Sequence, residues 1–230
     1  METTRTAGMN NFAGIDFEIV IPTCRFGMAE EAARSVFPYK TRLVDGRDAE
    51  SFSWLVNRCI LSSSTEVVII MNDKVRASHR DIEKIVRLLN SGYGLASLFL
   101  FGFFGLTKQL IREIGWFDER FKSGGYEDVD FQNRLIEANI ATYKTTEAPY
   151  LETGSSWPGN NNKEIYEKKW HEDFGSNRLV RLDIERPPPY VIPHGPVIIT
   201  WLQHDKASIL PPNNVHLMKA QVWSKLPGAS

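Results

Sequence analysis

The sequence has only two cysteines, Cys24 and Cys59, among its 230 residues. They fall in different expected elements and lack the short spacing of a metal-binding pair, so neither a disulfide framework nor a cysteine-based metal site is indicated. We therefore expect free thiols in a reducing compartment, which predicts a cytoplasmic location.

Long uncharged hydrophobic runs are also missing. No apolar stretch reaches the roughly 20 residues needed to cross a bilayer, and the longest, 92–107, is interrupted by glycines. Residues 1–11 are polar and lack the apolar region of a signal peptide. We expect a soluble protein with no transmembrane segment, either free in the cytoplasm or peripheral to a membrane.

The chain carries almost no net charge. Its formal net charge is −1, and its lysines and arginines form no continuous stripe, which argues against a nucleic-acid partner. Hydrophobic residues make up 42% and charged residues 24%, values typical of a globular protein that buries a sizeable core. This length favours one large domain, or one domain with an appendage.

Strand-like and helix-like segments alternate along the first two thirds of the chain. The expected strands are 17–22, 40–44, 66–71, 95–104 and 141–145. The expected helices are 28–36, 52–60, 78–89, 107–114, 127–138 and 164–172. Asp48 is the expected N-cap of the second, Ser78 with Asp81 starts the third, and Thr107 is the expected N-cap of the fourth. This alternation predicts an α/β fold: a single domain with a mainly parallel central sheet flanked by helices.

The composition changes near residue 181. Eight of the twelve prolines lie in 186–230, which favours an extended tail, although 197–201 is apolar enough to add one edge strand. We predict a domain at 14–180 and a proline-rich C-terminal extension or linker at 181–230.

Three carboxylates crowd into the segment 124–135, which reads GGYEDVDFQNRL. A helix N-terminus favours negative charge by about 0.3–1 kcal/mol per exposed group. That effect accounts for one or two acidic residues but not for Glu127, Asp128 and Asp130 together, because packed like charges raise one another's pKa. Carboxylates behind a Gly-Gly turn are typical of a site that takes a proton from a hydroxyl group. Asp130 alone is expected to be structural, either capping the helix or pairing with Arg134 four residues later.

Polar residues follow each of the first three expected strands. The segments are PTCRFG at 22–27, DGR at 45–47 and NDK at 72–74. In an open α/β sheet, ligands bind outside the carboxyl ends of the strands, so we expect these segments to meet at one edge. Asp45 fits a plain turn as well as it fits a ligand contact. Arg25 and Arg47 fit surface cations as well as phosphate contacts.

Taken in order, these segments resemble a GT-A-fold glycosyltransferase. The matching stretches are IVIPT at 19–23, VDG at 44–46, IIMNDKV at 69–75, GWFDERF at 115–121 and GGYEDVDF at 124–131. The closest type is family 2, with a Gly-Gly-x-Glu-Asp-x-Asp motif similar to that of galactosyltransferases. The resemblance spans 17–175, its most specific part is 115–135, and it implies a single GT-A, Rossmann-like domain.

The resemblance also implies a reaction. The donor would be a nucleoside-diphosphate sugar, most commonly a UDP-sugar, and the acceptor a hydroxyl of a glycan or glycoconjugate, as in polysaccharide biosynthesis. The enzyme would be a hexosyl- or pentosyltransferase that inverts the anomeric carbon by direct displacement. Asp128 is implied as the general base and Glu127 as the residue that holds the acceptor, with Gly125 and Tyr126 completing the acceptor site.

The same resemblance implies where the donor binds. The implied nucleotide-sugar residues are Pro22, Thr23, Arg25, Asp45, Asn72, Asp73 and Lys74. Residues 72–74 take the place of the family's metal-binding Asp-x-Asp motif, with only one carboxylate. Because Mn²⁺ and Mg²⁺ prefer carboxylate oxygens, the implied metal ligands are Asp73 and Glu152, which stands where many relatives carry a histidine. Lys74 could neutralise the diphosphate instead, so metal dependence and metal independence both stay open.

Two other function classes fit parts of the sequence. A sugar nucleotidyltransferase can share a similar core, but it needs a glycine-rich phosphate loop after the first strand, and 22–27 contains one glycine. A catalytically weak nucleotide- or carbohydrate-binding module is favoured by the incomplete motif at 72–74. The Glu127–Asp128 pair argues against that module, so we expect the glycosyltransferase.

Overall fold

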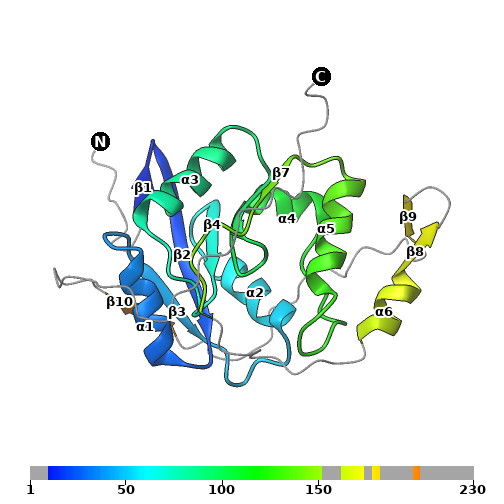
Figure 1. The fold of residues 1–230 in the computed structure, drawn as a ribbon, viewed down its shortest axis with the longest axis horizontal. Helices are drawn as coiled ribbons and strands as arrows, with labels where there is room; N and C mark the ends of the chain where they lie inside the picture. The colour runs from blue at the N-terminus through cyan, green and yellow to red at the C-terminus, as the bar shows by residue number, and fades with distance from the viewer. Residues whose placement is uncertain (1–9, 152–161, 174–177, 182–198, 203–230) are drawn as a thin grey trace.

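The computed structural model describes residues 10–151, 162–173, 178–181 and 199–202. An eight-stranded sheet forms its centre, with helices on both faces (Figure 1). The strands of this sheet are β1 (Asn10–Phe12), β2 (Ile15–Thr23), β3 (Thr41–Asp45), β4 (Val67–Met71), β5 (Leu95–Phe99), β6 (Phe103–Thr107), β7 (Thr142–Lys144) and β10 (Ile199–Leu202). The helices are α1 (Phe26–Ser35), α2 (Phe52–Leu61), α3 (His79–Asn90), α4 (Lys108–Ile114), α5 (Glu127–Glu137) and α6 (Asn162–Lys169). A separate two-stranded sheet pairs β8 (Trp170–Asp173) with β9 (Arg178–Arg181).

The central sheet is mixed. Its order is β10-β3-β2-β4-β6-β5-β7, with β1 beside β2. The pairs β2–β3, β2–β4 and β5–β7 are parallel, and the other four pairs are antiparallel. Five strands therefore share one direction, and β1, β6 and β10 run against them. The predicted α/β class with one helix-flanked sheet is confirmed, with more antiparallel pairing than the sequence suggested.

The extra antiparallel pairing arises at residues 95–104, which the sequence predicted as one strand. The chain instead turns between β5 and β6: Leu100 has a φ of 46°, and the Gly102 N–H donates to the Phe99 carbonyl at 2.8 Å. The turn residues are as apolar as the strands they join, so the hydrophobic pattern does not break where the backbone does.

Successive side chains of β2 and β4 point to opposite faces of the sheet and so belong to two different hydrophobic cores. Phe17, Ile19 and Ile69 belong to the core under α1 and α3. Val20 and Val68 belong to the core under α2, α4 and α5 on the opposite face. Strand β4 is buried along its whole length, as its continuous apolar run predicted. Packing on both faces holds the ends of β2, β3 and β4 in fixed relative positions.

Helix starts follow the sequence signals with one exception. Ser78 and Asp81 form a capping box at α3, and Thr107 Oγ1 accepts the Leu110 N–H at α4. The prediction of Asp48 as the cap of α2 is wrong, because Ser51 Oγ accepts the Trp54 N–H at 3.1 Å. Asp48 lies inside a turn that the Ala49 N–H and the Gly46 carbonyl close at 3.0 Å, and the helix begins only at Phe52.

Two groups of elements follow β7 in the sequence: α6 with β8 and β9, and the strand β10. Helix α6 runs directly into β8, and β10 pairs antiparallel with β3 as an edge strand, as predicted for 197–201. The division into 14–180 and 181–230 stays a prediction. Among the residues that the structure describes, no helix is long and apolar enough to cross a membrane.

Candidate active site

Two polar groups lie along the carboxyl edge of the central sheet. The strand-end cluster comprises residues 22–25, 45–47 and 72–74, at the ends of β2, β3 and β4. The acidic turn comprises residues 124–128 and leads into α5. Because α5 precedes β7, which runs in the same direction as β2, β3 and β4, its N-terminus faces the same edge as the ends of those strands (Figure 1).

Asp73 is the centre of the strand-end cluster. It is 4% exposed, and both of its carboxylate oxygens accept hydrogen bonds. Oδ2 accepts from Thr23 Oγ1 at 2.8 Å and from Arg25 Nε at 3.3 Å, and Oδ1 accepts from Arg25 Nη2 at 2.9 Å. The structure thus joins three residues predicted for the donor site, across about fifty positions of sequence.

Asp45 lies beside this group but binds Arg47. Its oxygens accept from Arg47 Nε at 3.0 Å and Nη2 at 2.5 Å, and this hydrogen bonding lowers the pKa of Asp45. Burial, followed by the charges of Asp73 and Asp45, raises the pKa of the Cys24 thiol above its ordinary value. Cys24 is therefore held as a neutral thiol, unlike a catalytic nucleophile.

Lys74 and Asn72 complete the cluster in different ways. Lys74 is buried, with its Nζ 5.8 Å from the centre of the Tyr150 ring, and burial followed by the charge of Arg25 lowers its pKa. Asn72 Oδ1 accepts the Lys74 backbone N–H at 3.0 Å, so the Asn72 side chain stabilises the turn after β4.

The cavity at these strand ends is small. Its volume is about 20 Å³, enough for roughly one water molecule. It is lined by Pro22, Thr23, Cys24, Phe52, Leu55, Asn72 and Asp73. A ligand larger than water must therefore lie over its mouth. At the start of α1, which follows residues 22–25 directly, a Cβ added to Gly27 would meet nothing within 4 Å.

The acidic turn has a left-handed backbone that a buried asparagine holds in place. Gly125 has a φ of 106° and Tyr126 a φ of 71°, a region that disfavours a side chain as large as tyrosine. Asn162 Nδ2 donates to the Lys122 carbonyl at 2.8 Å and to the Gly125 carbonyl at 2.9 Å. No sequence signal pointed to Asn162, because it lies 37 residues beyond the turn that it holds.

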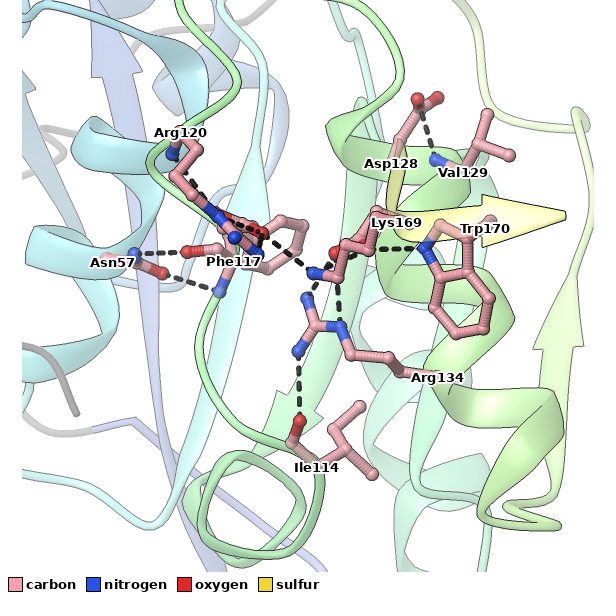
Figure 2. A network of polar contacts seen from close by, with 11 residues as sticks. Asn57, Ile114, Phe117, Arg120, Asp128, Val129, Arg134, Lys169 and Trp170 are labelled. Carbon is pink, nitrogen blue, oxygen red and sulfur yellow. Dashed lines mark hydrogen bonds and ion pairs between the residues drawn. The ribbon is translucent and has the colours of Figure 1, made fainter. Parts of the chain in front are cut away.

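The two carboxylates predicted for catalysis have different surroundings. Glu127 is 7% exposed, and its Oε2 is buried without a hydrogen-bond partner. Burial, and then the charge of Asp128, raises the pKa of Glu127 to about 7. Asp128 is half-buried, and its Oδ1 accepts the Val129 N–H at 2.9 Å (Figure 2). A carboxyl group that titrates near neutrality can exchange a proton with a substrate.

Lys144 is a site neighbour that sequence reasoning missed. It lies buried at the end of β7, where its Nζ donates to Gln132 Oε1 and sits 4.6 Å from the centre of the Phe101 ring. Burial lowers its pKa to about 8, against the opposing charge of Asp128. A lysine within a short strand is the one signal that could have drawn attention to it.

Asp130 is structural, as predicted. Its Oδ2 accepts from Arg134 Nε at 3.1 Å and Nη2 at 2.9 Å, which is the expected i, i+4 pair. Its Oδ1 accepts from Trp170 Nε1 at 2.8 Å and pairs with Lys169 Nζ at 2.8 Å. Figure 2 shows Lys169, Arg134 and Trp170 converging on this buried carboxylate.

Lys169 also joins this carboxylate to a second one. Its Nζ donates to Asp118 Oδ2 at 2.7 Å, and Arg120 Nη2 donates to the same oxygen at 2.7 Å. Burial opposes ionisation of Asp118, but the hydrogen bonds from Arg120 and the charge of Lys169 hold its pKa well below the usual range. The network fastens α6 against the start of α5 and so covers the acidic turn.

The described residues do not fit a divalent metal ion. Both oxygens of Asp73 already accept hydrogen bonds from Thr23 and Arg25. Glu152, the second implied ligand, lies outside the described residues. In the described part of the chain, no group of three or more His, Cys, Asp or Glu side chains could hold a metal.

No protein-family model and no curated protein matches this sequence. Among solved structures, the chain is similar to a mutant Drosophila β-1,4-galactosyltransferase 7 in complex with manganese, UDP-Gal and xylobiose. That match has a TM-score of 0.47 and 11% identity, and covers 83% of this chain and 95% of the other. It is also similar to a CMP-2-keto-3-deoxy-manno-octonic acid synthetase in complex with CTP. Here the TM-score is 0.38 and the identity 13%, with 66% of this chain and 95% of the other covered. Likenesses this weak assign no function.

Proposed function

We propose that this chain is a glycosyltransferase that moves a sugar from a nucleoside-diphosphate sugar, first of all a UDP-sugar, to a hydroxyl of a glycan or glycoconjugate. One observation carries the proposal. The adjacent carboxyl groups of Glu127 and Asp128, at the start of α5, and a cationic strand-end cluster lie along the same edge of one sheet. A transferase needs both a proton acceptor and an anion site within reach of one substrate pair.

One hydrogen bond links the strand-end cavity to the residue before the acidic turn, and a second leads from the strand-end cluster toward Lys144. Phe52 lines the strand-end cavity, and its N–H donates at 2.8 Å to the carbonyl of Ser123, just before the turn. On the other side, the Asn72 N–H donates at 2.7 Å to the carbonyl of Gly102. The neighbouring Phe101 ring lies against Lys144. These links support one shared site.

In the proposed reaction Asp128 is the general base. As the acceptor oxygen bonds to the anomeric carbon, the bond to the diphosphate oxygen breaks and the hydroxyl proton passes to Asp128, with inversion at that carbon. The half-buried position of Asp128 lets an acceptor reach it. Glu127 holds the acceptor: near pH 7 its carboxyl is present in both protonated and ionised forms, so it can donate or accept a hydrogen bond.

Gly125 and Tyr126 form the rest of the proposed acceptor site. The Tyr126 ring lies 5.2 Å from the Tyr166 ring of α6, which places two aromatic side chains beside the carboxylates. A Cβ added to Gly125 would meet nothing within 4 Å, so space is open against the backbone there.

A nucleotide- or carbohydrate-binding module is the second candidate. The hydrogen bonds that occupy both oxygens of Asp73 favour it, because this carboxylate is the only one at 72–74. The module and the enzyme differ in turnover, since only the enzyme releases a nucleoside diphosphate in the presence of an acceptor.

The test is a transfer assay on the purified chain with UDP-sugars and a panel of glycan acceptors, in which released UDP is measured. We expect Asp128→Asn to lower transfer at least about 100-fold, because a general base contributes 10²–10⁴ in rate. UDP binding should change less than about twofold, because the base acts on the acceptor. Glu137→Gln, an exposed change at the other end of α5, is the matched control and should leave transfer unchanged.

The possible results separate the candidates. Full transfer by Asp128→Asn removes this residue from the mechanism. UDP binding without transfer to any acceptor favours the binding module. No binding of any nucleoside diphosphate contradicts both candidates.

A further inference from the structure

Arg25 and Asp73 form a bidentate ion pair at the place where the family resemblance implies a metal. The Arg25 guanidinium lies 2.9 Å from Asp73 Oδ1 and 3.3 Å from Asp73 Oδ2. A divalent cation on the same carboxylate would bring two positive centres together, and like charges at such distances repel strongly. The carboxylate is thus neutralised by a cation of the chain itself.

The Arg25 side chain is held firmly yet reaches solvent. The Arg25 backbone N–H donates to Thr23 Oγ1 at 2.8 Å, and Thr23 Oγ1 in turn donates to Asp73. The Arg25 side chain is 34% exposed, whereas that of Asp73 is 5% exposed. Arginine binds phosphate oxygens through its planar fork of N–H donors, and a fork fixed in advance loses little side-chain entropy on binding.

Lys74 adds a second positive charge close to the first. It is buried directly after Asp73, with its Nζ 5.8 Å from the centre of the Tyr150 ring. An anion bound beside both side chains would be attracted by two positive charges. The start of α1 follows Arg25 directly, and a helix N-terminus also favours an anion. Open space at Gly27 leaves room for one there.

From these contacts we propose that the strand-end cluster binds a nucleotide diphosphate without a metal ion, through Arg25 held by Asp73 and through Lys74. The inference rests on the proposed glycosyltransferase function and specifies how its donor is recognised. Asp73 is then a positioning residue for Arg25. The diphosphate that leaves in the reaction is stabilised by two cationic side chains.

The test measures UDP binding to the full chain by isothermal titration calorimetry, once in EDTA and once in Mn²⁺. We expect dissociation constants within about twofold of each other. Arg25→Ala should weaken binding at least about tenfold in both buffers, the loss of one charge-assisted contact. Arg25→Lys keeps a cation beside Asp73 but lacks the fork, and should give an intermediate loss. Arg87→Ala, an exposed change on α3, is the matched control and should bind UDP as the unchanged chain does.

The outcomes distinguish this inference from the function on which it rests. UDP binding that requires Mn²⁺ and disappears in EDTA overturns the metal-free site but leaves the glycosyltransferase proposal standing. Unchanged affinity in Arg25→Ala, or in Arg25→Lys if the alanine variant does not fold, overturns the role of Arg25. If no nucleoside diphosphate binds in either buffer, the proposed function itself fails.

Discussion

At the scale of single residues, Glu127 is a carboxyl whose pKa burial raises to about 7. Its neighbour Asp128 is half-buried, whereas Glu127 has a buried oxygen without a hydrogen-bond partner. One step along the helix start thus separates a buried side chain from a half-buried one. This difference in burial is the reason for proposing different roles for the two adjacent acidic residues.

The stability of the protein should depend on pH through Glu127. Its pKa is about 7 in the folded chain against an ordinary 4.5, so between these values the folded state binds more protons than the unfolded state. Stability therefore falls as the pH rises from about 4.5 to 7. The difference of about 2.5 pKa units corresponds to about 3 kcal/mol. We expect Glu127→Gln to gain up to this amount relative to the unchanged chain between pH 5 and pH 8.

Urea unfolding at pH 5, 6, 7 and 8 measures this difference. Glu137→Gln, at the exposed end of the same helix, should show no such trend. Curves for Glu127→Gln that stay parallel to those of the unchanged chain across this range would show that Glu127 titrates normally.

At the scale of elements, α6 is attached to α5 by charge and hydrogen bonding. Lys169 lies between Asp118 and Asp130, with all three side chains buried. Asn133 Nδ2 also donates to the Tyr166 hydroxyl at 3.0 Å. Such polar contacts fix orientation more strictly than apolar packing does, so α6 should hold the acidic turn in one arrangement.

Removing the charge of Lys169 should loosen this attachment. Lys169→Met leaves two buried carboxylates without their shared cation, and breaking a buried pair costs about 3–5 kcal/mol. We expect a loss of about 3 kcal/mol in the free energy of unfolding, because Arg134 and Arg120 still serve the two carboxylates. We also expect faster hydrogen exchange in 162–173. Lys163→Met, an exposed change on the same helix, is the control. Equal stability of Lys169→Met and the unchanged chain would contradict a structural role for the network.

At the scale of the whole molecule, both hydrophobic clusters consist of residues that precede the proline-rich segment. Every residue of the two hydrophobic clusters lies between Phe12 and Tyr150. Beyond residue 181, the described part contributes only the edge strand β10. This arrangement supports the proposed domain at 14–180.

A chain that ends at residue 181 should therefore still fold. It loses the four-residue pairing of β10 with β3 but keeps both cores, so we expect cooperative thermal unfolding by circular dichroism, at a somewhat lower midpoint. A chain that ends at residue 161 also loses α6 and Lys169 and should be clearly less stable. Non-cooperative unfolding of the 181-residue chain would place the domain boundary further along the sequence.

The sequence by itself determined the α/β class, because apolar runs and helical periodicity are local properties that the fold preserves. It also determined two of three helix caps and the pairing of Asp130 with Arg134, since these contacts span only three or four residues. The hairpin between β5 and β6 escaped prediction because its turn is as hydrophobic as its strands.

Only the tertiary structure decided how the candidate site is arranged. The Arg25–Asp73 pair, the hold of Asn162 on Gly125 and the position of Lys169 between two carboxylates join residues 37 to 51 positions apart. The burial of Glu127, which sets its pKa, depends on the elements packed around it. Local sequence specifies which groups are present, but their charge states and partners follow from which strands and helices the fold brings side by side.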